Sequence, residues 1–283
     1  MTEIYNKFMS QKFGYVAISG PTNSGKSTLL NAIFEKKVSI VSHKVQTTLR
    51  SMDVVKNYNN TQMVFIDTPG FYEKKNNANY LKDVLSSIQR SDLLLIILDV
   101  TSKFIYLEQI KKIIHHYNKK KFLIINKIDL VDNEYILKKI QEIRFLETFD
   151  EIFYLSALKK KNLDKLLNKI SDNLSEKKWM YKKNNSTNIT KETFLAEITR
   201  EGILKYLNQE IPYQISVITD KIIKSNNYTI HQKILVQTSS HKKIILGKNG
   251  HSIKAIGSYS RLEMEKVLKC KCNLFLKVVL KKR

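Results

Sequence analysis

The segment Gly20-Pro-Thr-Asn-Ser-Gly-Lys26-Ser27 has the residue types and spacing of a phosphate-binding loop. Its glycines allow backbone N–H groups to turn inward, and the N-terminus of the following helix adds positive potential. We expect Lys26 to reach the β- and γ-phosphates of a nucleotide and the Ser27 hydroxyl to bind Mg²⁺. A plain strand–turn–helix connection is the alternative. The predicted nucleotide contacts here are Gly20, Pro21, Thr22, Asn23, Ser24, Gly25, Lys26 and Ser27.

A second segment, Asp67-Thr68-Pro69-Gly70, follows another apolar run. A carboxylate at this place can hold a water molecule bound to Mg²⁺, so we predict Asp67 as a metal ligand through water. The Gly70 N–H can face the γ-phosphate with no side chain in the way. Loss of that phosphate would release the segment that follows, as in order–disorder switches. Taken alone, these four residues are also compatible with a surface turn.

A third segment, Asn126-Lys127-Ile128-Asp129, is suited to selecting a base. The Asp129 carboxylate can accept two hydrogen bonds from the ring N–H and the exocyclic amine of guanine, whereas adenine lacks that amine. A site of this kind rejects the wrong base by up to ~10⁴–10⁵. We expect Asn126 to tie this segment to the phosphate-binding loop and the stem of Lys127 to cover the base. Ser156, Ala157 and Leu158 follow a further apolar run, where a backbone N–H can meet the guanine carbonyl.

These segments each end a short apolar run, and helical patterns separate the runs. Such alternation predicts an α/β fold, in which a mostly parallel six-stranded sheet is covered on both faces and binds ligands beyond the C-terminal strand ends. The predicted strands are Phe13–Ser19, Ser51–Tyr58, Gln62–Asp67, Leu93–Asp99, Phe122–Asn126 and Ile152–Leu155. The predicted helices begin after Lys26 and lie at Tyr80–Gln89, Leu107–Tyr117, Glu134–Leu146 and Leu163–Leu174.

The chain of 283 residues is long enough for two domains. We assign 1–175 to the nucleotide-binding domain, 176–191 to a polar, basic linker, and 192–283 to a small α+β domain. The small domain is predicted to contain a helix at Glu192–Leu207, strands at Gln214–Ile223 and Tyr228–Thr238, and a helical turn at Gly247-Lys-Asn-Gly250. A helix at Ser252–Leu268 and a strand at Asn273–Leu280 follow.

The charge of the chain is strongly positive, with 49 Lys and Arg against 26 Asp and Glu. Residues 176–283 hold 22 basic and 8 acidic side chains, so the small domain is the more basic part. A positive field attracts nucleic acids and anionic membranes. A base-composition bias that enriches Lys throughout the chain is the alternative explanation.

Two further features concern the compartment in which the protein works. Cys270 and Cys272 are too few for a tetrahedral zinc site, and free thiols in a reducing cytoplasm are expected. We find no secretory leader and no apolar run long enough to span a bilayer.

The order and spacing of these segments resemble the translation-factor-related class of GTPases over residues 12–175. The resemblance implies binding of GTP and GDP with Mg²⁺, and a Thr before the second strand that binds Mg²⁺ in the triphosphate state. Gln46-Thr47-Thr48-Leu49-Arg50 fills that place, and we favour Thr48 over Thr47. Thr48, Lys26, Gly70 and Asn23 are the predicted catalytic residues. Relatives with Asn at the place of Asn23 use K⁺ in place of an arginine finger, so the resemblance implies K⁺ there.

Phe71 occupies the position at which Ras-like proteins have a water-orienting Gln. A phenyl ring neither donates nor accepts a hydrogen bond, so other groups must place the water, or hydrolysis is slow until a partner helps. Phe71 can instead simply pack on its surroundings. A nucleotide-sensing scaffold with negligible turnover is the non-enzymatic alternative. Asn126 and Asp129 argue against a kinase or an ATPase.

The segment Ile244-Ile-Leu-Gly247-Lys248-Asn249-Gly250-His-Ser-Ile resembles the GxxG loop of a KH domain, which clamps about four nucleotides of single-stranded nucleic acid. Lys243, Lys248 and Lys254 surround the loop. A lone GxxG also marks many helix ends. Ile244, Ile245 and Ile253 can line a groove for bases or fill the core. The predicted RNA contacts are Gly247, Lys248, Asn249, Gly250, Lys243 and Lys254.

The segments Glu197-Ile-Thr-Arg-Glu-Gly-Ile-Leu and Glu210-Ile-Pro-Tyr-Gln resemble the start of the KH domain in Era-like bacterial GTPases. With the nucleotide motifs and the domain order, this resemblance covers nearly the whole chain. It implies a GTP-hydrolysing factor that binds small-subunit ribosomal RNA and acts in rRNA processing and assembly of the small ribosomal subunit. It also implies a cytoplasmic monomer with peripheral contact with the inner membrane. The sequence departs from the family at Leu158-Lys-Lys-Lys161, which lacks the usual glycine.

Overall fold

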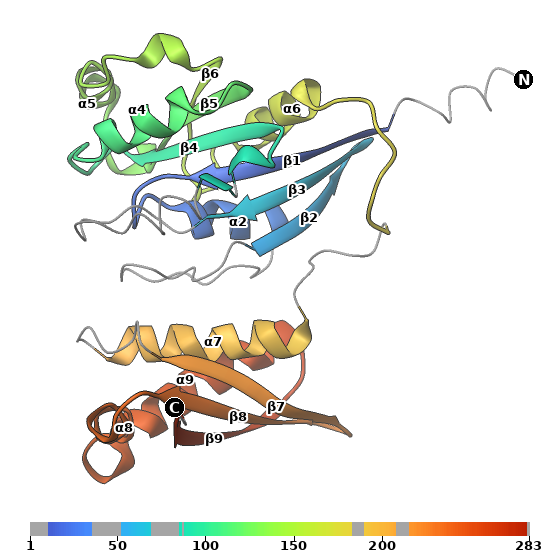
Figure 1. The fold of residues 1–283 in the computed structure, drawn as a ribbon, viewed down its shortest axis with the longest axis vertical. Helices are drawn as coiled ribbons and strands as arrows, with labels where there is room; N and C mark the ends of the chain where they lie inside the picture. The colour runs from blue at the N-terminus through green and yellow to red at the C-terminus, as the bar shows by residue number, and fades with distance from the viewer. Residues whose placement is uncertain are drawn as a thin grey trace, which may run out of the picture. The chain divides into compact units, whose positions relative to one another are not determined.

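The computed structural model describes residues 11–35, 52–68, 85–86, 88–182, 190–207 and 215–281. Thr47, Thr48, Pro69, Gly70 and Phe71 therefore lie outside the described residues, as does the segment Glu210–Gln214. The described chain divides into two compact units, the first up to residue 182 and the second from residue 190. Each unit has its own sheet and core (Figure 1).

The first unit is built on a six-stranded sheet in the order β2-β3-β1-β4-β5-β6. Only the pair β2–β3 is antiparallel, and the four other pairs are parallel. The strands are β1 (Lys12–Ser19), β2 (Met52–Tyr58), β3 (Thr61–Asp67), β4 (Leu93–Asp99), β5 (Lys120–Asn126) and β6 (Glu151–Tyr154). The predicted mostly parallel sheet is confirmed, and the predicted strand limits differ from those observed by at most two residues.

Helices cover both faces of this sheet (Figure 1). α4 (Leu107–His115) and α5 (Asn133–Ile140) pack against one face around Ala17, Ile66 and Leu94. α2 (Lys26–Phe34) packs against the other face, where the Phe34 ring meets the Phe65 ring edge-on. α6 (Leu163–Asn173) follows β6, and Leu174 beyond its end faces Gly14 of β1. Strands β3 and β4 are buried along their whole length, as expected when both faces of a parallel sheet are covered.

The predicted helix over Glu134–Leu146 is too long. α5 ends at Ile140, and a short 3₁₀ helix (Leu146–Thr148) follows. The carbonyls of Lys139 and Ile140 accept hydrogen bonds from residues only three positions further on, so the chain tightens into turns. Ile143 and Phe149, which lie beyond the end of α5, are part of the core. Of the predicted helix Tyr80–Gln89, the structure describes helical residues at 85–86 and 88–89.

The first part of the predicted linker is fastened to the first unit. Glu176 bridges to Lys12, and the indole N–H of Trp179 donates to the Asn60 carbonyl (3.3 Å). The Tyr181 backbone exchanges two hydrogen bonds with the side chain of Gln62, each 2.9 Å long. Residues 176–182 thus extend the first unit, because their polar groups pair with its strand ends. Residues 183–189 lie outside the described part of the chain.

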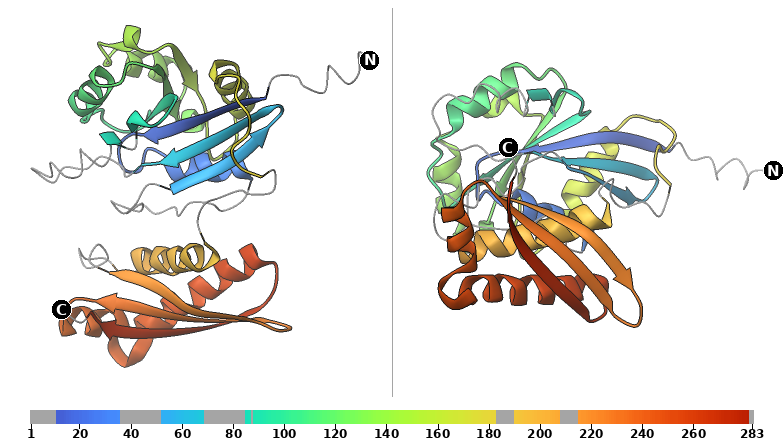
Figure 2. Two further views of the ribbon diagram at one scale, coloured as in Figure 1. Left: turned by 45° about the vertical axis from the view of Figure 1, so that its right-hand side comes forward. Right: turned by 60° about the horizontal axis from the view of Figure 1, so that its bottom comes forward.

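The second unit has a three-stranded sheet, β7 (Ser216–Lys224), β8 (Tyr228–Val236) and β9 (Cys272–Leu280), in that spatial order. β7–β8 is antiparallel and β8–β9 is parallel. Helices α7 (Lys191–Tyr206), α8 (Ser239–Leu246) and α9 (His251–Leu268) complete the predicted α+β domain. Figure 2 shows the long helices lying along one side of this sheet. The helix after the GxxG loop, α9, has 18 residues and begins one residue before the predicted Ser252.

Ile203, Ile234, Ile245, Ile256 and Val278 form the central part of this unit's core. Both cysteines are free thiols, as expected, and Cys272 at the start of β9 is buried. No helix in the described part of the chain is long and apolar enough to cross a membrane.

Candidate functional site

The phosphate-binding loop connects β1 to α2 and is shaped by two glycines in unusual conformations. Gly20 has φ 150° and Gly25 has φ 102°. A Cβ atom on Gly20 would lie 2.2 Å from the Ile97 carbonyl oxygen, and one on Gly25 would lie 2.1 Å from Nδ2 of Asn126. The loop therefore packs directly on the ends of β4 and β5, and no side chain fits at either glycine. Because Gly25 ends the loop, α2 begins at Lys26 with its free N–H groups facing the loop.

Lys26 is buried, although its charge favours water. Its Nζ donates to the carbonyls of Gly20 (2.9 Å) and Pro21 (2.6 Å), which leaves one of its three donors for a ligand. Burial lowers the pKa of Lys26 to about 8, and the negative charge of Asp67 opposes that shift. A buried cation in a glycine-lined loop fits the phosphate groups of a nucleotide, since an anion would compensate the lost solvation.

Asp67 lies at the end of β3, on the same edge of the sheet as the phosphate-binding loop. It is fully buried, and its charge acts on Lys26. The next residue, Thr68, fastens this strand end to β1, because its hydroxyl and its N–H both bond to the Ile18 carbonyl. Asp67 and Ser27 therefore lie on neighbouring elements, which suits the shared Mg²⁺ predicted for them. Within the described residues, no cluster of His, Cys, Asp or Glu forms a metal site made of protein ligands alone.

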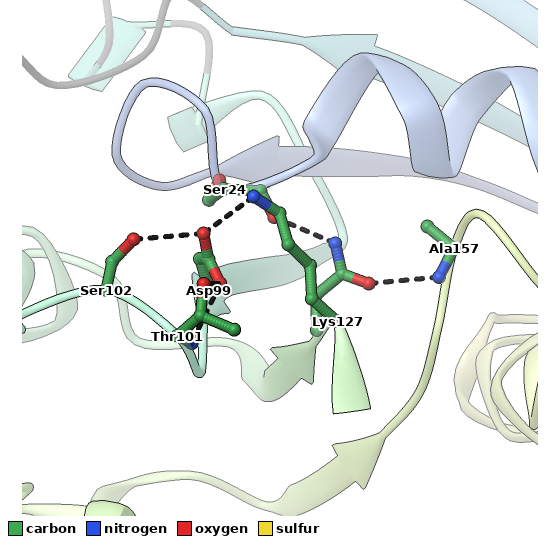
Figure 3. A network of polar contacts seen from close by, with 7 residues as sticks. Ser24, Asp99, Thr101, Ser102, Lys127 and Ala157 are labelled. Carbon is green, nitrogen blue, oxygen red and sulfur yellow. Dashed lines mark hydrogen bonds and ion pairs between the residues drawn. The ribbon is translucent and has the colours of Figure 1, made fainter. Parts of the chain in front are cut away.

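Asn126 ties three loops together, and the predicted link to the phosphate-binding loop is present. Its Nδ2 donates to the Ser24 carbonyl (2.8 Å), and its Oδ1 accepts from the Ala157 N–H (3.0 Å). Figure 3 shows the two bonds as dashed lines that end at the labelled Ser24 and Ala157. The side chain is buried, so both bonds are shielded from water.

The Ala157 N–H therefore has a protein partner, and that of Ser156 donates to the Lys161 carbonyl (3.3 Å). A backbone N–H of this segment was predicted to meet the guanine carbonyl. In the structure, the N–H groups of Ser156 and Ala157 bond within the protein and hold the loop in place, and the contact with guanine stays a prediction. The loop lacks the usual glycine, yet it turns because Lys160 adopts a left-handed conformation with φ 55°. Leu158 projects outward and is exposed.

Lys127 and Asp129 differ in their surroundings. Asp129 lies in a 3₁₀ turn (Ile128–Leu130) and is exposed, so its carboxylate is accessible to a base. Lys127 has a left-handed backbone with φ 65°, and its Nζ donates to Oδ2 of Asp99 at 2.6 Å. The Asp99 carboxylate thus fixes the far end of the Lys127 side chain, whose stem is predicted to cover the base.

Asp99 is a site residue that the sequence motifs did not reveal. It ends β4, between the strands that carry the phosphate-binding loop and Asn126. Its carboxylate accepts from the Thr101 N–H (2.9 Å), the Thr101 hydroxyl (2.7 Å), the Ser102 hydroxyl (2.9 Å) and Lys127 (Figure 3). Burial alone would raise the pKa of Asp99, but the bonds from Lys127 and Thr101 outweigh it and hold that pKa below its ordinary value. An acidic residue at a C-terminal strand end, followed by Thr and Ser, was the signal in the sequence.

The GxxG loop of the second unit joins α8 to α9. Gly247, Asn249 and Gly250 all have positive φ, at 73°, 51° and 75°. A Cβ atom on Gly247 would lie 2.3 Å from the Ser252 hydroxyl oxygen, so the loop is folded tightly on the start of α9. Lys243, Lys248 and Lys254 are exposed around the loop, and none of them pairs with a carboxylate in the described structure. Ile245 is a core residue, whereas Ile244 and Ile253 are half-buried beside it.

Together these features define a P-loop GTPase joined to a KH domain. A family model described as "50S ribosome-binding GTPase" matches residues 15–127, and a KH domain model matches residues 210–283. The GTPase Era of Ehrlichia ruminantium (strain Gardel) is 36% identical over 276 residues, which cover 95% of this chain and 92% of that protein. The GTPase Era of Borrelia garinii subsp. bavariensis is 39% identical over 280 residues, with coverages of 96% and 95%.

Two solved structures agree with this assignment. One is Era in complex with MgGDPNP and nucleotides 1506–1542 of 16S ribosomal RNA, which is 34% identical, has a TM-score of 0.87 and covers 96% of this chain and 94% of that chain. The other is a variant of Aquifex aeolicus Era bound to GDP·AlF₄⁻, also 34% identical, with a TM-score of 0.84 and coverages of 95% and 94%. The chain belongs to the GTPase Era family.

Replacing Asp99 by Asn tests the role of its charge. We expect Asp99→Asn to destabilise the first unit by about 1–3 kcal/mol at neutral pH, because Lys127 loses a buried ionic acceptor. A depressed carboxyl pKa contributes stability above the ordinary value of 3.8, and this contribution is lost as the pH falls further. The difference in the free energy of unfolding between wild type and variant should therefore become smaller as the pH falls below 3.8. Urea unfolding followed by the fluorescence of Trp179, the single tryptophan, reports on this unit.

Glu134→Gln is the matched control for this measurement. It removes an ion pair with Lys138 in which both side chains are more than 70% exposed, so its effect should be near zero. A stability loss in Asp99→Asn that stays constant down to pH 3 would contradict the ionic role.

Proposed function

We propose that this protein is a Mg²⁺-dependent GTPase that binds small-subunit ribosomal RNA and acts in rRNA processing and assembly of the small ribosomal subunit. The observation that carries the proposal is the clamp formed by Asn126, which brings the phosphate-binding and base-selecting segments to one edge of the sheet. A relative of matching domain content binds MgGDPNP and a 16S rRNA fragment, which supports both halves of the function.

In this proposal, GTP or GDP lies along the carboxyl ends of the strands. Lys26 and the N-terminus of α2 bind the phosphates, while Asp129 selects guanine and Lys127 covers it. Mg²⁺ would be held by Ser27 and Thr48, with Asp67 acting through a bound water. The ion would neutralise charge that develops on the phosphates during hydrolysis. Gly70 would donate its N–H to the γ-phosphate. Because Phe71 occupies the position of the Gln of Ras-like proteins, no Gln at that position orients the attacking water.

The domain assignment also belongs to the proposal. Residues 1–175 hold the nucleotide site, 192–283 form the RNA-binding domain, and the attached segment 176–182 ends the first unit. We propose a cytoplasmic monomer whose positive charge, +23, supports peripheral contact with anionic inner-membrane lipids. Flotation with anionic vesicles at physiological salt measures that contact. If the protein does not float with the vesicles, the proposed membrane contact is refuted.

Multiple-turnover release of phosphate from GTP tests the enzymatic function. We expect slow turnover that the 16S rRNA fragment of nucleotides 1506–1542 increases, because no Gln orients the water. We also expect faster turnover in K⁺ than in Na⁺, because in this proposal Asn23, which is exposed and has φ 64°, helps to hold K⁺ at the phosphates. Asn23→Ala should remove the K⁺ effect. Equal rates in the two salts would refute the role of K⁺. If no turnover is detected, the enzymatic function is refuted and the protein is a nucleotide-sensing scaffold.

Asp129→Asn tests base selection. The amide presents a donor where guanine needs an acceptor, so GDP affinity should fall by about a hundredfold or more. Xanthine has a carbonyl in place of the exocyclic amine, so binding of XDP should improve. Competition of GDP, XDP and ADP for one fluorescent nucleotide measures both effects. Asp164→Asn, an exposed acid on α6, is the control and should leave all three affinities unchanged. An Asp129→Asn variant with the wild-type preference would contradict the assignment.

The double variant Lys248→Asp, Asn249→Asp tests the RNA-binding loop. Two carboxylates in the GxxG loop would repel the RNA backbone, so binding of the 16S rRNA fragment should be lost while GDP affinity holds. Fluorescence anisotropy of labelled RNA measures the affinity for the RNA fragment, and nucleotide competition measures the affinity for GDP. Unchanged affinity for RNA would refute the KH assignment.

A further inference from the structure

The sheet of the second unit has one covered face and one open face. Along β8, burial alternates, so that Ile230, Gln232, Ile234 and Val236 are buried and the residues between them are only partly buried. The buried set contacts the core side chains of α7, α8 and α9. His231, Lys233 and Leu235 therefore point to the opposite face, and no described element of this unit covers it. The GxxG loop belongs to the covered side, because it joins α8 to α9.

A pair of aromatic rings, one exposed and one partly buried, lies on the open face. The register of the parallel strands places His231 of β8 opposite Phe275 of β9. Their rings are stacked, with centroids 4.9 Å apart and planes inclined by only 11°. The Phe275 side chain is 54% exposed, although a phenyl ring normally lies in the core. Two flat rings held parallel on a rigid sheet make a platform on which another planar group can stack.

Lysines surround this aromatic pair. Lys221 of β7 lies opposite His231, and Lys233 of β8 lies opposite Lys277 of β9. The neighbouring acid, Asp220, is bound to Lys233 at 2.9 Å, while Lys221 and Lys277 are exposed and make no ion pair in the described structure. The open face thus combines stacked rings with an excess of positive charge.

We propose that the open face of this sheet is a second single-stranded RNA-binding surface, on which bases stack on Phe275 and His231 while Lys221, Lys233 and Lys277 contact phosphates. The proposal rests on the proposed RNA-binding function and adds a site to it. Stacking on aromatic side chains beside a positive groove is how proteins bind single strands with little sequence preference. β9 is an edge strand, so a strand of RNA can pass from one side of the sheet to the other around it.

Charge favours RNA over the other possible occupants. A second copy of this chain would bring the same excess of lysine to the interface, so self-association would be opposed by repulsion. A protein partner would use the apolar part of the face, including Ile218 and Ile223, and would tolerate any apolar side chain at position 275. RNA requires an aromatic ring there. This difference makes the two occupants distinguishable by substitution at Phe275.

Substitutions at Phe275 in the full-length protein provide the test. The probes are the 16S rRNA fragment of nucleotides 1506–1542 and a short oligonucleotide of about six nucleotides, just long enough for the GxxG loop. We expect Phe275→Ala and Phe275→Leu to weaken binding of the long fragment about five- to a hundredfold, and Phe275→Trp to retain it. Binding of the short oligonucleotide should not change, which also shows that the domain is folded. Tyr135→Ala, at an exposed tyrosine of the first unit, is the aromatic control.

The lysines are tested by the salt dependence of binding. The double variant Lys221→Gln, Lys277→Gln should lower the slope of log K against log salt for the long fragment by about 1.4, or about 0.7 per lost phosphate contact. The double variant Lys111→Gln, Lys165→Gln changes the net charge equally at exposed positions of the first unit and should leave the slope unchanged. A lysine that served only folding would not alter this slope.

Each outcome separates this inference from the proposed function. If Phe275→Ala binds the long fragment as tightly as wild type, the second surface is refuted and the GxxG site stands. If Phe275→Leu binds the long fragment normally while Phe275→Ala does not, RNA binding depends on apolar bulk at this position and not on an aromatic ring, which refutes base stacking and with it the inference. If the wild-type protein binds neither RNA, the proposed function itself fails.

Discussion

The carboxamide of Asn126 is the constraint on which the nucleotide site depends. A parallel sheet brings its strand ends to one edge, but the loops that leave those ends are free to diverge. One buried side chain prevents this, because it donates to the phosphate-binding loop and accepts from the loop after β6. An amide can make both bonds, whereas a carboxylate or an ammonium group can make only one of the two kinds. Gly25 completes the arrangement, since a Cβ atom there would occupy the place of the amide.

Around this clamp, opposite charges are held on separate elements. Lys26 is kept by carbonyls of its own loop, Asp67 ends β3, and the Lys127–Asp99 pair spans the ends of β5 and β4. Each of these groups is held in position by hydrogen bonds or ion pairs within the protein. Such preorganisation lowers the cost of binding, because the side chains have little freedom left to lose. Four hydrogen bonds to the Asp99 carboxylate serve the same end, since they keep it ionised in a buried place.

Much of this organisation was predictable from local sequence. Apolar runs indicated the strands nearly to the residue, and the phosphate-binding loop, Asn126 and Asp129 lie where their motifs placed them. The misses share a physical cause, which is that they depend on contacts between distant segments. α5 ends early in turns whose hydrogen bonds span three residues, and residues 176–182 look like a linker until Trp179 and Tyr181 meet strand ends far away in the sequence. Asp99 carries no motif, and only the neighbouring Lys127 shows what it does.

The second unit poses a different problem, because a GxxG loop grips only a short stretch of nucleic acid. Clamping about four nucleotides gives limited affinity and limited sequence information. A second, weaker surface on the same rigid sheet turns the binding of the next few nucleotides into an intramolecular event, which multiplies affinity without requiring any stronger contact. The sheet suits this purpose because its two faces are chemically independent. Isoleucines and valines on one side build the core, while the alternate positions are free to carry Phe275, His231 and lysines. The twofold alternation of a strand thus allows one small sheet to support its own core and to present a second binding surface.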